Sequence, residues 1–239
     1  MDIKSKLMFV FVLVCFNTYA QDQNLKKTDA KEIVRKINNK ILESKYFTAN
    51  LNYEIFKNHN DTLVFQSLPG FYKRSGTSEH SLLVGIETIQ NTNERLVIDT
   101  VNETMLLSNP VQKPQLIENS LNAAIEMCKS ITLTKYNSQS KLSFNLSTDA
   151  NTGFNKVEIN FENATYTVSS ITIYYTNAVI PGFDDISNPK ITISYTNIDN
   201  SKIDKDEFKI ESFLKKQNNL YVPLDRFKNF TFLNQYIQK

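Results

Sequence analysis

The sequence feature that most constrains the fold is a strict alternation of apolar and polar residues over positions 47–55. The apolar members of the alternation are Phe47, Ala49, Leu51, Tyr53 and Ile55. Successive side chains of a β-strand point to opposite faces, so a period of two predicts a strand with one buried face. Similar segments, separated by turn residues, recur along the chain. The pattern therefore predicts a fold dominated by antiparallel sheet.

Turn-forming residues divide the chain into further strands. Asn58–Asp61 and Asp99–Glu103 are predicted turns, and Pro69-Gly70 is predicted to interrupt a strand. The alternation of apolar and polar residues shifts by one position at Ser169-Ser170, which predicts a β-bulge. The further strands are expected at Leu63–Leu68, Phe71–Arg74, Leu82–Ile86, Glu94–Ile98, Thr104–Ser108, Ile131–Tyr136, Leu142–Leu146, Lys156–Phe161, Thr165–Tyr175, Lys190–Asn197, Glu207–Leu224 with a turn at Asn218-Asn219, and Phe227–Tyr236.

Two stretches have helical periodicity instead. The first begins at Asp29, where Asp29-Ala-Lys-Glu32 has the spacing of a capping box. Its apolar stripe consists of Ala30, Ile33, Val34, Ile37 and Ile41. The second spans residues 115–130, with a stripe of Ile117, Leu121, Ala124, Ile125 and Cys128. Each stripe needs an apolar surface to lie on.

These elements predict a single domain over residues 29–239, because no internal repeat or low-complexity linker divides them. A sheet of this width curls instead of lying flat. The predicted fold class is α+β, mainly antiparallel β. We expect a curled sheet of about 10–11 strands, with the helices on or in its concave apolar face.

Residues 1–20 have the three-part shape of a secretory signal. Two lysines precede the apolar run Leu7–Phe16, and a small residue ends the segment. The run has about ten residues, half of the roughly 20 that span a bilayer. We therefore expect cleavage near Ala20/Gln21, then a polar leader at residues 21–28. The mature protein is expected to be periplasmic or secreted, without a transmembrane segment.

The two cysteines bear on the location and the disulfide state of the mature protein. Cys15 lies near the end of the apolar run, and lipidation there is the alternative to cleavage. A lipidated chain would sit on a membrane. Cleavage at Ala20 would leave Cys128 alone, so no internal disulfide is expected. Cys128 falls on the apolar side of the second predicted helix, which favours a buried, unreactive thiol.

Charge and motifs argue against several function classes. The formal net charge is +2 and the basic residues are scattered, so no nucleic-acid footprint is present. His59 and His80 have no second His or Cys at metal-ligand spacing. Asp184-Asp185 offers too few oxygens for calcium. The sequence predicts no catalytic residue, no metal, no cofactor and no enzyme; a hydrolase acting through His59 or His80 is the catalytic alternative.

The layout from about residue 29 to the C-terminus resembles the LolA-like family of periplasmic outer-membrane lipoprotein carriers. The local likenesses are Phe47-Thr-Ala-Asn-Leu-Asn-Tyr-Glu-Ile55 after the first helix and Leu96-Val-Ile-Asp99 before a turn. The resemblance implies a half-open barrel whose cavity, covered by helices, takes up lipid chains. The chain departs from the family in lacking Trp and in matching only part of a proline-glycine strand at Ser67-Leu-Pro-Gly-Phe71. Another apolar ligand or a protein partner therefore stays open.

The resemblance also implies which residues would line the cavity. The second helix would contribute Ile117, Leu121 and Ile125 as part of a lid. The wall would consist of Leu51, Ile55, Val84, Ile86, Leu96, Ile98, Met105, Leu107, Phe144, Ile159, Phe161, Ile171 and Ile173. The alternative is that all of these side chains form an ordinary packed core.

Two functions follow from this reading. The first is a non-enzymatic periplasmic carrier that shields an apolar ligand, either a lipid or the acyl chains of a lipoprotein. The second is a structural or accessory protein of a cell-envelope or secretion assembly, with envelope proteins as partners and a concavity filled by its own side chains. A ligand pocket would have a volume of roughly 300–1,000 Å³ and mostly apolar walls.

Overall fold

The structure is a computed structural model that describes residues 21–111, 118–147, 153–176, 186, 188–218 and 220–236. Its main sheet has thirteen strands within these ranges. In spatial order they are β1 (Gln21–Asn24), β8 (Cys128–Lys135), β9 (Gln139–Leu146), β10 (Phe154–Glu162), β11 (Val168–Tyr175), β12 (Lys190–Asp199), β2 (Tyr46–Phe56), β3 (Gln66–Ser75), β4 (Ser78–Leu83), β5 (Ile86–Gln90), β6 (Arg95–Asp99), β7 (Thr104–Ser108) and β15 (Thr231–Asn234). The remaining elements are helices α1 (Lys27–Leu42) and α2 (Glu118–Glu126), the hairpin β13 (Leu214–Gln217) and β14 (Leu220–Pro223), and the 3₁₀ turns η1 (Lys205–Phe208), η2 (Ile210–Ser212) and η3 (Asp225–Phe227).

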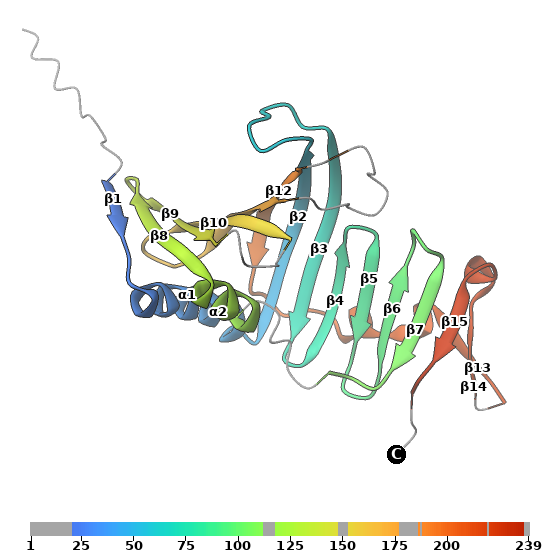
Figure 1. The fold of residues 1–239 in the computed structure, drawn as a ribbon. Helices are drawn as coiled ribbons and strands as arrows, with labels where there is room; N and C mark the ends of the chain where they lie inside the picture. The colour runs from blue at the N-terminus through green and yellow to red at the C-terminus, as the bar shows by residue number, and fades with distance from the viewer. Residues whose placement is uncertain are drawn as a thin grey trace, which may run out of the picture.

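The predicted fold class is confirmed. Neighbouring strands of the main sheet pair antiparallel, except that β15 runs parallel to β7. The sheet is open, with β1 at one edge and β15 at the other. It curls so that β8, β9 and β10 bend around α1 and α2, whereas β3 to β7 form a flatter half (Figure 1). The C-terminal segment passes along the side of the flatter half that is away from the helices (Figure 1).

The beginning of the chain differs from the expectation. Residues 21–28, expected as a polar leader, include β1, which adds to the edge of β8 through pairs such as Gln21 with Lys135. Helix α1 begins before Asp29, with Lys26 as its N-cap and no side-chain cap. The predicted capping box is therefore wrong, since Asp29 lies inside the first helical turn, where its charge complements the helix dipole.

The single strand predicted at Leu82–Ile86 is wrong, because the segment contains the end of β4, a hairpin turn at Val84-Gly85 and the first residue of β5. Val84 and Gly85 have φ angles of 50° and 80°, which strands do not contain. The predicted break at Pro69-Gly70 is also wrong, because β3 runs through it. The pairing of β4 with β3 ends at Phe71, before Pro69, so no backbone acceptor of β4 is left without the N–H that proline lacks. A Cβ at Gly70 would lie 2.5 Å from the carbonyl oxygen of Leu82, so the strands meet there only because the residue is glycine.

Several other elements differ from the prediction in their bounds or type. The helix expected over 115–130 ends at Glu126, and Cys128 begins β8. The bulge is confirmed: Asn160 pairs with Ser170 and Phe161 with Val168, so Ser169 is the extra residue. The strand predicted at Glu207–Leu224 consists instead of 3₁₀ turns followed by the hairpin β13–β14. The returning strand predicted at Leu63–Leu68 begins only at Gln66.

Candidate functional site

The candidate site is the face of the sheet that packs against the two helices, called here the helix face. Its core contains Ala30, Val34, Ile37, Ala124 and Ile125 from the helices, and Ile131, Leu133, Leu142, Phe144, Leu146, Val157, Ile159, Phe161 and Val168 from the sheet. A second cluster continues it across β2, with Phe47, Ala49, Leu51 and Tyr53. The helix face is therefore apolar over the curled half of the sheet.

The strand register assigns the predicted wall residues to faces. Directly paired residues share a face, and the pairs Phe144–Val157, Ile159–Ile171 and Ile191–Ile55 carry the helix face from β9 to β2. The predicted residues on this face are Leu51, Ile55, Phe144, Ile159, Phe161, Ile171 and Ile173, with Ile125 opposite them on α2. The structure thus brings these eight together, and their contact with a ligand stays a prediction.

Four predicted wall residues lie on the opposite face. Leu96, Ile98, Met105 and Leu107 are fully buried against Ile210, Phe213, Leu214 and Tyr221 of the C-terminal segment. They cannot line the same surface as Ile159. Of the other predicted residues, Val84 and Ile86 are 37% and 42% exposed beside a hairpin turn. Ile117 lies outside the described residues, and so does the side chain of Leu121.

The apolar wall ends at β3. Beyond it the helix face carries the buried polar residues Glu79, Ser81, Thr88 and Gln90, which pair with one another across β4 and β5. The side chain of Gln90 bonds the backbone of Thr77 and Val111. The apolar surface changes sides at this point, from the helix face in the curled half to the opposite face in the flatter half.

Side chains of the helices fill most of the concavity. A cavity of about 50 Å³ is found beneath the C-terminal half of α1. It is lined by Lys40, Ile41, Phe47, Tyr166, Thr167, Val168, Tyr195, Ile198 and Asn200. This volume is far below the roughly 300–1,000 Å³ of a ligand pocket. In this conformation the helices cover the apolar surface of the curled half.

Arg74 holds the end of α1 against the sheet. Its guanidinium donates to the backbone oxygens of Ile41 and Ser44, the second at 2.8 Å. Exposed carbonyls at a helix C-terminus favour such a cation. Arg74 pairs with Glu79 across β3 and β4, and both are 5% exposed. Burial raises the pKa of Glu79, and the charges of Arg95 and Arg74 offset this only in part.

The two helices are joined at their outer side. Glu126 of α2 lies 3.7 Å from Lys27 and 2.5 Å from Lys31 of α1. These ion pairs are about half exposed and contribute little stability. They connect α1 to α2.

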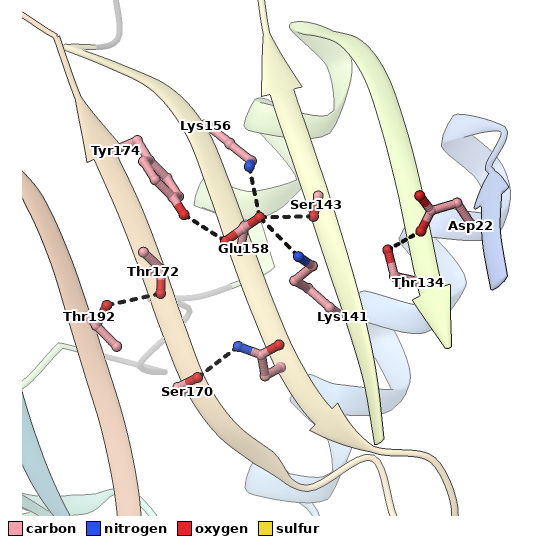
Figure 2. Close-up of polar contacts among 11 residues, drawn as sticks. Asp22, Thr134, Lys141, Ser143, Lys156, Glu158, Ser170, Thr172, Tyr174 and Thr192 are labelled. Atoms are coloured by element: carbon pink, nitrogen blue, oxygen red, sulfur yellow. Dashed lines mark hydrogen bonds and ion pairs between the residues drawn. The ribbon is translucent and has the colours of Figure 1, made fainter. Parts of the chain in front are cut away.

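The opposite face of the curled half is polar, as Figure 2 shows. Glu158 accepts a hydrogen bond from the Tyr174 hydroxyl at 2.8 Å and pairs with Lys156 at 2.8 Å and Lys141 at 3.6 Å. Burial alone would raise the pKa of Glu158, but the hydrogen bonds and lysine charges outweigh it and hold the pKa below its usual range. This carboxylate is therefore neutralised by its neighbours. The polar surroundings leave the helix face as the apolar surface of this half.

The two histidines sit apart from each other. His59 Nε2 donates to the carbonyl oxygen of Tyr175 at 2.7 Å, and His80 Nε2 bonds Glu87 at 2.8 Å. Within the described ranges, no group of three His, Cys, Asp or Glu could hold a metal ion. Asp184-Asp185 lies outside those ranges. Burial raises the pKa of Cys128 to about 11, and its thiol donates to the carbonyl oxygen of Ala124.

No protein-family model and no curated protein matches the chain. Among solved structures, an uncharacterized conserved protein from Thermus thermophilus has 9% identity and a TM-score of 0.44, covering 87% of this chain and 99% of that one. A putative outer membrane lipoprotein-sorting protein domain from Vibrio parahaemolyticus has 11% identity and a TM-score of 0.34, with 78% and 99% covered. A LolA superfamily protein from Nitrosomonas europaea has 10% identity and a TM-score of 0.30, with 77% and 98% covered.

The last two structures come from the class of protein that the sequence resembles. At these identities and TM-scores, the likeness assigns no activity to this chain. In the part of the chain that is described, no helix has the length and apolar character needed to cross a membrane.

Proposed function

We propose that this protein is a non-enzymatic periplasmic carrier that shields an apolar, lipid-like ligand on its helix face. The observation that carries the proposal is the continuous apolar surface from β8 to β2, which α1 and α2 cover in the described part of the chain. Residues 1–20, as a secretory signal, would direct the protein out of the cytoplasm. The ligand would be a lipid or the acyl chains of a lipoprotein, and no bond would be made or broken.

Binding would require α1 and α2 to move off the sheet. The helices bury Val34, Ile37 and Ile125 against it, and exposing three such side chains costs roughly 5–9 kcal/mol. An acyl chain that buried ten methylene groups in their place would regain about 8 kcal/mol. The ligand would therefore have to replace the contacts that the helix side chains make with the sheet.

The small cavity favours a second candidate, a structural or accessory protein of an envelope assembly. A concavity filled by the protein's own side chains needs no ligand. A cavity of about 50 Å³ agrees with this function without any movement of the helices. The two candidates differ in whether the helices ever leave the helix face.

Native mass spectrometry of protein purified from the envelope, followed by denaturing extraction and lipid analysis, tests the carrier function. We expect a stoichiometric lipid or lipopeptide that is released on unfolding. Ile173→Asn should abolish its retention, whereas Thr172→Asn, in the same strand but on the opposite face, should retain it. A clean apo mass that envelope lipids do not change would favour the accessory protein.

A further inference from the structure

The loop between β2 and β3 carries an apolar triplet that is open to solvent. Leu63, Val64 and Phe65, called here the apolar tip, are 84%, 44% and 47% exposed. They lie in the loop at the top of the view in Figure 1, where the hairpin β2–β3 extends past its neighbours. Single exposed apolar residues are ordinary on a protein surface, but a contiguous group marks a contact site.

The loop is held in place by bonds at several points. The backbone nitrogen of Phe65 donates to the carbonyl oxygen of Ile55 at 2.8 Å. Lys190 Nζ donates to the carbonyl oxygen of Asp61 at 2.8 Å, and His59 is fixed to the carbonyl oxygen of Tyr175. These bonds reach the loop from β2, β11 and β12. The exposure of the apolar tip is therefore imposed by the fold.

Two lysine amines lie near the base of the loop that carries the apolar tip. Lys57 Nζ lies 4.4 Å from the ring centre of Phe65, and Lys190 Nζ lies 4.3 Å from that of Phe56. The Asp61 carboxylate accepts two hydrogen bonds from Asn58, at 3.0 and 3.3 Å, so its charge is directed into the turn. Apolar side chains with ammonium groups at their base match the change from acyl chains to phosphates at a bilayer surface.

We propose that this loop docks the protein on the surface of a phospholipid bilayer. Leu63, Val64 and Phe65 insert between the headgroups, and Lys57 and Lys190 contact lipid phosphates. A protein partner is the weaker candidate, because three side chains offer far less than the roughly 1,200 Å² that a stable protein interface buries. Shallow insertion into lipid needs no such area. The proposal does not depend on whether the helix face binds a ligand.

The absence of Trp from the chain allows a direct test. The variant Phe65→Trp, made without residues 1–20, places one indole in the apolar tip. With vesicles of phosphatidylethanolamine and phosphatidylglycerol, we expect a blue shift of its emission and quenching by lipids with brominated acyl chains. The control is Leu220→Trp, at a residue 65% exposed in β14, and it should show neither effect.

Vesicle cosedimentation measures the contribution of each part. Leu63→Asp should weaken binding about tenfold or more, whereas Leu220→Asp should change it less than about twofold. Lys57→Gln should weaken binding to vesicles with phosphatidylglycerol, which is anionic, more than binding to pure phosphatidylcholine, whose phosphate is balanced by choline. Equal thermal unfolding of the two aspartate variants excludes misfolding as the cause. Unshifted emission of Phe65→Trp, or equal binding of the two aspartate variants, would overturn the proposal.

Discussion

Replacing Arg74 by methionine should destabilise the protein by about 3–5 kcal/mol near neutral pH. The guanidinium is buried and bonds the backbone oxygens of Ile41 and Ser44 at the end of α1. Methionine fills a similar volume but donates nothing. The variant would leave these carbonyls without their donor and would leave the buried carboxylate of Glu79 with one fewer cation beside it.

The loss should depend on pH through Glu79. Burial already raises its pKa above the ordinary 4.5, and removing the charge of Arg74 raises it further. A carboxyl group with a raised pKa in the folded state favours folding at low pH, and this contribution disappears as pH rises through the folded-state pKa. The destabilisation by Arg74→Met should therefore be largest at neutral pH and should shrink as pH falls toward 4.5.

Urea unfolding followed by circular dichroism, between about pH 5 and 8, measures this dependence. The double variant Arg74→Met/Glu79→Gln should recover part of the lost stability at neutral pH, because it removes the unpaired charge. Lys73→Met is the matched control: it breaks the half-exposed pair with Glu207 and should cost less than about 1 kcal/mol. A loss that is the same at every pH, or that Glu79→Gln leaves unchanged, would refute the assignment.

Three further predictions concern other parts of the molecule. Cys128, with a pKa of about 11, should react slowly with iodoacetamide at mild pH. Lipid that displaces the helices should accelerate this alkylation, which mass spectrometry measures. Rapid labelling of the apo protein would contradict the prediction. Leu107→Ala should lose about 2–5 kcal/mol in urea unfolding without changing the lipid retained per folded molecule, whereas loss of lipid would place Leu107 at the site. Gly85→Ala should cost about 1–3 kcal/mol, since its φ is 80° and its Cβ would lie 3.1 Å from Val101; unchanged stability in the same assay would argue against that turn.

Local patterns predicted much of the secondary structure. The alternation at 47–55 became β2, and the parity slip at Ser169 became a bulge. Predictions failed where long-range pairing decided the outcome. Residues 21–24 have no apolar pattern, and they form a strand because the edge of β8 offers unpaired backbone groups. Pro69 stays within β3 because β4 ends before it.

The candidate site was predictable only in part. The residues from β2, β9, β10 and β11 share one surface, while Leu96 and Met105 belong to another. Nothing in the alternation of β6 or β7 distinguishes these cases, since either face of a strand can be the buried one. Arg74 was also missed, because its function depends on carbonyls of α1 that the sequence cannot place beside it.

The sequence by itself determined that this chain forms a mainly antiparallel sheet with two amphipathic helices, because the hydrophobic period of each segment is a local property. Only the tertiary structure decided which face of each strand is covered, and by what. Register and twist relate a side chain in β9 to one in β2, and a shift of one residue would send every side chain of a strand to the other face. Two segments bury the apolar residues of the sheet: the helices pack on those of the curled half, and the C-terminal segment packs on those of the flatter half.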